Sequence, residues 1–269
     1  MKRYCIIGNP VKHSKSPQIY DYIFNQLNLK AKYDSHCIIT NSLFENFIYN
    51  TKNYMGYNIT APYKGLAYSL IDEVHSSARL VNAVNCIKII NNKLIGYNTD
   101  YYGFKKLLEK QKINFNDKKF LILGNGSTAK TVSKILINLY NAKIFIWGRN
   151  KKNINSFIDF NNNLNHSNSI RLYDKTQVDK YILINCLPFT INNIDVNNIF
   201  NNILFENIKL FIDVNYVNNI LIDSVTKMNI KTISGKDMLL YQALKNLDLW
   251  FDDNYSKKID FKTLKQNIF

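Results

Sequence analysis

Cysteine, histidine and long apolar runs are scarce in this chain, and each scarcity excludes a class of protein. The 269 residues include only four cysteines and four histidines. The cysteines form no C-x-x-C pair, which indicates small apolar residues in a reducing compartment rather than a disulfide framework or a zinc site. The histidines are equally scattered, so no metal-ligand spacing is present and we expect no bound metal.

No apolar run is long enough for a membrane span. A basic start, Lys2-Arg3, precedes the short run Tyr4–Ile7, but Gly8-Asn9-Pro10 ends that run before it could serve as a signal peptide. We therefore expect a soluble, cytoplasmic protein with no membrane partner.

Acidic residues are too few to balance the lysines and arginines, so the net charge is +15 and the pI is near 9.5. Such an excess can mark a nucleic-acid binder. No zinc-finger, RRM or basic-helix signature is present, however, and the basic residues do not gather into one block. We favour lysines spread over solvated surfaces, with no nucleic-acid partner, and note that the charge can attract an anionic cofactor and substrate.

Strand-like and helix-like segments alternate along the chain, which predicts an α/β fold with mostly parallel sheets. The expected strands are Tyr4–Ile7, 32–39, 57–60, 83–90, 93–97, 119–123, 143–147, 181–186 and 209–214. Asn91-Asn92 predicts a hairpin turn, and Ser16-Pro17 predicts a helix start with serine as the N-cap. Residues 161–169 are polar and are expected to form a loop, whereas 236–251 has the spacing of an amphipathic helix.

The segment after the strand 119–123 has the pattern of a dinucleotide-binding loop. Gly124-Asn125-Gly126-Ser127-Thr128-Ala129 is a G-x-G-x-x-A sequence that leads into a helix. Gly124 permits the tight turn, Gly126 lets a pyrophosphate approach the backbone, and Ala129 allows the helix to pack closely on the strand. The N–H groups of the first helical turn would then hold the phosphates.

The next strand ends in Gly148-Arg149-Asn150-Lys151-Lys152 and carries no acidic residue. NAD-specific sites usually place an Asp or Glu there to bind the ribose hydroxyls. Arg149 could instead bind a 2′-phosphate with its planar guanidinium. The sequence therefore predicts NADP(H) rather than NAD(H).

Polar side chains punctuate the first hundred residues, each at a strand end or turn. They lie in His13–Pro17, in Asn58–Thr60 with Lys64, in Ala83–Asn85 and in Asn98–Asp100. Hydroxyls, an amide, an ammonium and a carboxylate suit a small polyhydroxylated acid. Lys64, just beyond the strand and Pro62, can polarise a carbonyl or pass a proton.

These segments, in this order, resemble the shikimate dehydrogenase family. The resemblance rests on GNPVKHSKSP, GYNITAPYK, AVN and GYNTDYYGF, on GNGSTAK with the Gly148-Arg149-Asn150 turn, and on GKDMLLYQA near the end. It implies reversible NADPH-dependent reduction of 3-dehydroshikimate to shikimate in aromatic biosynthesis. It also implies an α/β substrate domain (1–100) with helix 237–269 packing back on it, and a Rossmann-like domain (101–236), with a cleft between them.

The resemblance further implies roles for single residues. Lys64 and Asp100 would be the catalytic pair. The substrate would be bound by Ser14, Ser16, Thr60, Lys64, Asn85, Asp100, Tyr216 and Gln242. The cofactor would be bound by Gly124, Asn125, Gly126, Ser127, Thr128, Ala129, Arg149, Asn150, Lys151 and Gly235. The sequence departs from the family pattern at Ser127, Gly148 and Asn150, and in Asn185–Phe189.

Three other interpretations remain at this stage. An NAD-dependent quinate or shikimate dehydrogenase would share the substrate segments, but the basic turn at Arg149 argues against it. A non-catalytic NADPH-binding sensor would have no need of Lys64 with Asp100. A nucleic-acid binder is suggested only by charge. The sequence is equally compatible with a monomer and with a homodimer.

Overall fold

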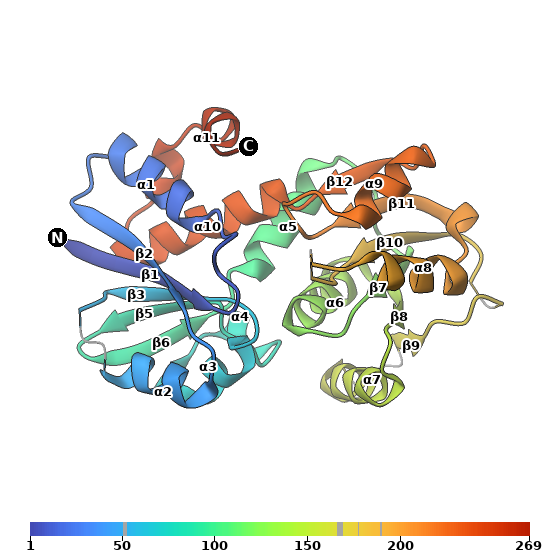
Figure 1. Cartoon of the computed structure of the whole chain (residues 1–269), viewed down its shortest axis with the longest axis horizontal. Helices are drawn as coiled ribbons and strands as arrows, with labels where there is room; N and C mark the ends of the chain where they lie inside the picture. Colours follow the sequence, from blue (N-terminus) through green and yellow to red (C-terminus); the bar gives the residue numbers. More distant parts are fainter. Residues whose placement is uncertain (51–52, 166–168, 177, 189) are drawn as a thin grey trace. The chain divides into compact units, whose positions relative to one another are not determined.

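A computed structural model describes residues 1–50, 53–165, 169–176, 178–188 and 190–269, without the side chains of 163–165. The chain forms two compact units, residues 1–106 with 239–269 and residues 107–238 (Figure 1). Alternating strands and helices build one six-stranded sheet in each unit. The predicted α/β class is therefore confirmed.

The sheet of the first unit has the order β2-β1-β3-β5-β6-β4. Its strands are β1 (Lys2–Gly8), β2 (Ala31–Cys37), β3 (Gly56–Ile59), β4 (Glu73–Val74), β5 (Cys86–Ile90) and β6 (Lys93–Tyr97). β1 pairs in parallel with β2 and β3, whereas β5 is antiparallel to both neighbours. Asn91 and Asn92 both have positive φ, as the predicted hairpin turn between β5 and β6 requires.

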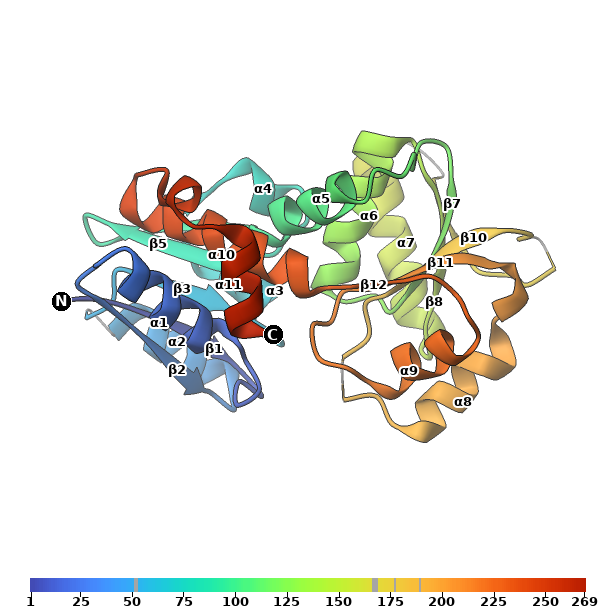
Figure 2. The same cartoon turned by 90° about the horizontal axis from the view of Figure 1, so that it is seen from above.

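Alternation along β1 explains how both faces of this sheet are covered. Tyr4 and Ile6 belong to one apolar cluster with residues of α1 (Ser16–Gln26), α10 (Lys236–Phe251) and α11 (Phe261–Ile268). Cys5 and Ile7 belong to a second cluster with residues of α2 (Asn41–Asn50) and α3 (Lys64–Leu70). Figures 1 and 2 show these two helix groups on opposite faces of the sheet. Successive side chains of a strand point to opposite faces, so one strand serves both cores.

The second unit has an all-parallel sheet in the order β9-β8-β7-β10-β11-β12. Its strands are β7 (Lys119–Leu123), β8 (Lys143–Trp147), β9 (Ile170–Leu172), β10 (Tyr181–Asn185), β11 (Ile208–Asp213) and β12 (Thr232–Ser234). Numbered along the chain, this is the Rossmann order 3-2-1-4-5-6, with its switch point between β7 and β10.

Helices cover both faces of this second sheet (Figure 2). They are α6 (Ser127–Tyr140) and α7 (Lys151–Asn165) on one side, with α8 (Asn193–Asn202) and α9 (Ile220–Lys227) on the other. The remaining helical segments are α4 (Ser76–Arg79), α5 (Asp100–Lys110), η1 (Phe205–Asn207) and η2 (Tyr255–Lys258). Within the described ranges, no helix is long and apolar enough to cross a membrane.

Three local predictions were wrong. Lys15, not Ser16, occupies the N-cap of α1, and the Ser14 hydroxyl accepts a hydrogen bond from the Ser16 N–H at 3.2 Å. The expected loop from 161 is helical to Asn165, while 166–168 lie outside the described residues. The segment 237–269 is not one helix, because α10 ends at Phe251 and Asp252 takes a positive φ.

Candidate active site

Lys64 and Asp100 form an ion pair in the first unit. The Lys64 Nζ lies 2.6 Å from the Asp100 Oδ2, and the two side chains are only 14% and 11% exposed. Lys64 begins α3 just after β3, and Asp100 begins α5 just after β6. The ends of two strands thus bring together residues 36 positions apart in the sequence, and partial burial shields the pair from water.

Asn85 holds the other oxygen of this carboxylate. The Asn85 Nδ2 donates to the Asp100 Oδ1 at 2.9 Å, and the backbone N–H of Thr99 donates to the Asn85 Oδ1 at 2.7 Å. The Thr99 contact fixes which end of the Asn85 amide faces Asp100. Asp100 also sits in the first turn of α5, where the helix dipole favours a carboxylate. Its orientation is therefore set from several directions.

Ser16 connects to the same network through Tyr33, which the sequence analysis did not name, and through Asn58, which it named only as part of a polar segment. The Tyr33 hydroxyl interacts with the Ser16 side chain and donates to the Asn58 Oδ1 at 2.7 Å. The Asn58 Nδ2 in turn donates to the Asn85 backbone carbonyl at 3.2 Å. Ser16 is buried and Ser14 half-buried beside it.

Thr60 lies at the carboxyl end of β3, and its N–H donates to the Ile7 carbonyl of β1. These two strands are neighbours at the point where the strand order of the first sheet reverses. Open α/β sheets bind ligands at such a switch point.

Gln242 belongs to the same unit and is buried on α10. Its Oε1 accepts from the Asn246 Nδ2 at 3.1 Å, and the Thr99 Oγ1 donates to the Asn246 Oδ1 at 2.6 Å. The structure thus links Gln242 with Asn85, Asp100 and Lys64 through one buried polar chain. The sequence carried a signal for Asn246: it stands one helical turn after Gln242 on the apolar face of α10.

In the second unit, the loop Gly124–Ala129 follows β7 at the switch point of the Rossmann sheet. Gly124 has φ +94°, and Gly126 is the N-cap of α6 with no side-chain hydrogen bond to the first turn. A Cβ placed on Gly126 would meet nothing within 4 Å. Ala129 is fully buried. The helix N-terminus is thus open for an anion.

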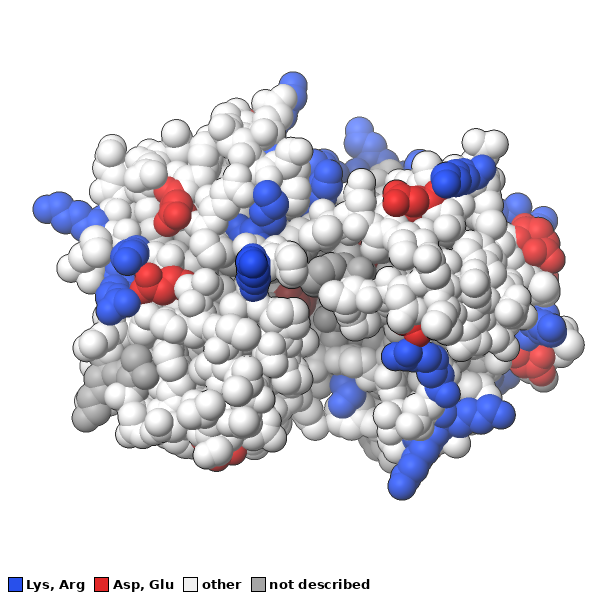
Figure 3. Space-filling view, viewed as in Figure 1, with Lys and Arg blue, Asp and Glu red and all other residues white. Residues whose placement is uncertain are grey.

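Residues that could bind a 2′-phosphate follow β8. Arg149 is exposed and donates to the Asp195 Oδ1 at 2.6 Å, while Asn150 caps α7 by accepting from the Asn153 N–H. Lys151 is exposed at the start of α7. In Figure 3, Lys and Arg side chains form small groups on each unit, with neutral surface between the groups.

Tyr216 and Gly235 also belong to the second unit. Gly235 is packed so closely that a Cβ would lie 2.0 Å from the Val214 carbonyl oxygen. Tyr216 is half-buried in the loop after β11. That loop is anchored by Asp213, whose carboxylate accepts from the Asn219 Nδ2 at 2.7 Å and from the Asn215 N–H at 2.9 Å. Burial raises the pKa of Asp213, although these hydrogen bonds oppose the rise.

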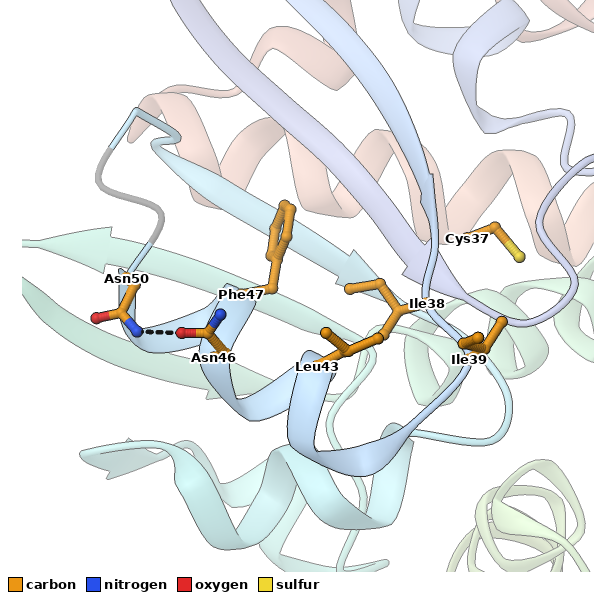
Figure 4. A pocket seen from close by; sticks show the side chains of 7 residues that line it. All are labelled: Cys37, Ile38, Ile39, Leu43, Asn46, Phe47 and Asn50. Carbon is orange, nitrogen blue, oxygen red and sulfur yellow. Dashed lines mark hydrogen bonds between the residues drawn. The ribbon is translucent and has the colours of Figure 1, made fainter.

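A cavity of about 460 Å³ in the first unit is separate from the predicted site residues. It lies between α2 and the end of β2, where the side chains of Ile38 and Phe47 line it together with Leu43 (Figure 4). Its lining is mostly apolar and contains no ionisable side chain other than the Cys37 thiol. Among the described residues, no group of three or more His, Cys, Asp or Glu side chains could hold a metal ion.

Comparison with known proteins agrees with this geometry. Residues 6–87 match the shikimate dehydrogenase substrate binding domain. The shikimate dehydrogenase (NADP(+)) of Clostridium perfringens is 31% identical over 262 residues, which cover 93% of this chain and 92% of that protein. The chain belongs to the shikimate dehydrogenase family. A Methanococcus vannielii member, also described as a shikimate dehydrogenase (NADP(+)), is 31% identical over 91% of this chain and 89% of its own.

The fold is also that of solved members of the shikimate dehydrogenase family. A crystal structure of one member in complex with NADP+ is 26% identical, with a TM-score of 0.82, and the match covers 100% of this chain and 94% of that chain. The family and the fold implied by the sequence motifs are therefore both confirmed.

Proposed function

We propose that this protein is an NADP-dependent shikimate dehydrogenase, which interconverts 3-dehydroshikimate and shikimate in aromatic biosynthesis. The observation that carries the proposal is the largely buried pair of Lys64 and Asp100, fixed by Asn85 at the strand ends of the first unit. An ammonium held in this way can stabilise a developing oxyanion and deliver a proton to it.

NADPH, when bound, supplies the hydride that reduces the substrate carbonyl carbon. The residues present fit this cofactor: α6 begins without a side-chain cap, Gly126 leaves room at its N-terminus, and Arg149 lies after β8. Residues Gly124–Ala129 would hold the pyrophosphate. Arg149, Asn150 and Lys151 would hold the 2′-phosphate, and Gly235 would lie beside the nicotinamide.

Lys64 would place its Nζ against the substrate oxygen and give a proton to the alkoxide as it forms. Asp100 would keep the ammonium oriented and accept a hydrogen bond from the adjacent hydroxyl. Because Asn85 already occupies the Oδ1 of Asp100, the carboxylate cannot rotate freely while it does so. In the reverse direction, Lys64 would take the proton from the alcohol.

The remaining polar residues would bind the substrate. Ser14 and Ser16 suit its carboxylate, whereas Thr60, Asn85 and Gln242 suit its hydroxyls. Tyr216 of the second unit would also bind the substrate. We further propose that residues 1–100, with 237–269, form the substrate domain and that 101–236 form the cofactor domain. We also propose a cytoplasmic location, because the four cysteines are all free thiols and a reducing compartment keeps thiols in that state. The protein would act there as a monomer or a homodimer.

The test is the initial rate of NADPH oxidation with 3-dehydroshikimate, followed by identification of the product as shikimate. Dehydroquinate serves as the control substrate, because a quinate dehydrogenase would reduce it. The proposal predicts rapid reduction of 3-dehydroshikimate and little of dehydroquinate. An absence of turnover with 3-dehydroshikimate, while NADPH still binds, would instead favour the non-catalytic sensor.

A further inference from the structure

We propose that Asn246 is a positioning residue, which fixes the direction of the Gln242 amide and connects it to the catalytic pair. Asn246 is fully buried in α10, and its side-chain hydrogen bonds join it to Tyr20, Thr99 and Gln242. The proposal rests on the proposed function, in which Gln242 binds the substrate.

Every polar hydrogen and one acceptor site of the Asn246 amide are used. Its Nδ2 donates to the Gln242 Oε1 and to the Tyr20 hydroxyl, both at 3.1 Å. Its Oδ1 accepts from the Thr99 Oγ1 at 2.6 Å. A buried amide is costly unless it is satisfied in this way, and a satisfied network holds a single arrangement.

The orientation of the Asn246 amide follows from its neighbours. The Tyr20 hydroxyl lies 3.2 Å from the Ala243 carbonyl, which can only accept, so the Tyr20 proton points there. The Tyr20 oxygen must then accept from Asn246, and this identifies the facing atom as the amide nitrogen. The Asn246 oxygen is left for the Thr99 hydroxyl.

The same reasoning sets the orientation of Gln242. Because the Asn246 nitrogen is a donor, the Gln242 atom that faces it must be Oε1. The Gln242 Nε2 donates one hydrogen to the Leu239 carbonyl at 2.9 Å. A carbonyl can only accept, so this contact supports the same orientation of the Gln242 amide. Gln242 therefore offers a ligand an N–H donor, which suits a hydroxyl or carboxylate oxygen.

On its other side, Asn246 reaches the catalytic pair through Thr99. The Thr99 hydroxyl donates to Asn246, and the N–H of the same residue donates to Asn85, whose amide holds Asp100. Loss of Asn246 would free the Gln242 amide to turn over and would leave the Thr99 hydroxyl with the Asn85 Oδ1, 3.1 Å away, as its acceptor. We expect weaker substrate binding, with cofactor binding unchanged.

A double-mutant cycle tests this coupling through the Michaelis constant for shikimate, with NADP+ saturating. Asn246→Leu and Gln242→Ala should each raise that constant about tenfold, equivalent to about 1.4 kcal/mol. If Asn246 acts through Gln242, the double variant should be no worse than Gln242→Ala, because neighbours in one network are not additive. The constant for NADP+ should stay within about twofold of the wild type.

Leu247→Ala is the matched control, since Leu247 is the next residue of α10 and is fully buried in the apolar core. It should lower the melting temperature while leaving the Michaelis constant for shikimate unchanged. If Asn246→Leu fails to fold, Asn246→Ala replaces it in the same cycle. That variant loses the donor to Gln242 and the acceptor for Thr99 without adding bulk or charge to the buried site.

Two outcomes would overturn the proposal alone: a wild-type Michaelis constant in the folded Asn246 variant, or single effects that multiply to about a hundredfold in the double variant. Wild-type protein that does not oxidise shikimate would refute the proposed function, and this inference with it. The two failures are therefore distinguishable by the wild-type rate.

Discussion

At the scale of single residues, Lys64 has the most specific surroundings. Its ammonium meets one carboxylate, and that carboxylate is in turn held by the Asn85 amide. A surface lysine would have neither the burial nor the fixed partner. The arrangement is what a group needs if it is to act on an oxyanion at a defined position.

Replacement of Lys64 tests that role. Lys64→Ala should lower kcat for shikimate oxidation by about 10² or more, the usual scale for a positioned acid or base. Binding of shikimate and NADP+, measured by calorimetry, should survive. A kcat close to that of the wild type would remove Lys64 from the mechanism.

Arg149 should decide the choice between the two dinucleotides. Arg149→Ala should raise the Michaelis constant for NADPH by about tenfold or more, because a charged hydrogen bond to phosphate is lost. The constant for NADH should hardly change. Equal effects on both cofactors would refute the assignment of this residue to the 2′-phosphate.

Asp195 offers an opposite test at the same place. Its carboxylate would compete with the 2′-phosphate for the Arg149 guanidinium, because the Asp195 Oδ1 accepts a hydrogen bond from the Arg149 Nη1 at 2.6 Å. The Asp195 side chain is only 18% exposed. Asp195→Asn should release Arg149 and lower the Michaelis constant for NADPH by a few-fold. Asn at this position still fits the start of α8, although it weakens the capping box with Asn192. A rise in the constant would show that the ion pair holds Arg149 in its binding position.

At the scale of elements, the turn between β7 and α6 combines two glycines with different physical requirements. Position 124 requires glycine because its φ of +94° is a backbone conformation that other residues rarely adopt. Gly126 has an ordinary φ of −77° and open space around it. Stability should therefore depend on Gly124, and cofactor binding on Gly126.

Paired substitutions separate these two requirements. Gly124→Ala should cost about 1–2 kcal/mol of unfolding free energy, because a side chain disfavours the left-handed region. Gly126→Asp should change stability by only a few tenths of a kcal/mol, as aspartate is a good N-cap. It should nevertheless abolish NADP+ binding, since a carboxylate would occupy the place of the phosphates. Unimpaired NADP+ binding by Gly126→Asp would contradict this use of the helix N-terminus.

A pH effect is expected where β1 and β2 meet. Burial raises the pKa of Asp34, but hydrogen bonds from Arg3, Tyr54 and Lys32 outweigh it and lower the pKa below 3.8. The stabilisation is thus complete above the unfolded-state pKa and is lost as pH falls through the lower folded-state value. Asp34→Asn should cost about 1 kcal/mol or less at about pH 7, since Arg3 is partly exposed.

Urea denaturation of the wild type and of Asp34→Asn, at about pH 7 and about pH 2.5, measures the difference in their unfolding free energies. The two stabilities should approach each other at the lower pH, as Asp34 becomes protonated and loses its charge. A gap that persists undiminished would show that packing, rather than charge, accounts for the loss.

Element prediction from the sequence succeeded where hydrophobic periodicity was strong and failed where tertiary contacts decide. α10 was predicted with its observed bounds, because Met238, Ala243, Leu244 and Leu247 follow a regular apolar spacing. The end of α7 is asparagine-rich, and such polar composition resembles a loop. Its helical state depends on contacts such as Asn162 with Ile170 of β9, which no local pattern reveals.

At the scale of the whole molecule, each unit carries one of the two groups of residues to which we assign a function. The first unit holds the paired Lys64 and Asp100 with the polar network around them, and the second holds the Rossmann loop and Arg149. Motif order along the chain was enough to indicate both halves and the family. It could not reveal Tyr33, whose role arises from hydrogen bonds between distant segments, and for Asn246 it gave only a position one helical turn after Gln242.

The most direct test of the account is steady-state reduction of NADP+ by shikimate, with wild type and Lys64→Ala measured side by side and NAD+ as the alternative cofactor. We predict rapid turnover by the wild type, a strong preference for NADP+, and a loss of about 10² or more in the variant. Equal rates for the two proteins, or no reduction of either cofactor by the wild type, would contradict it.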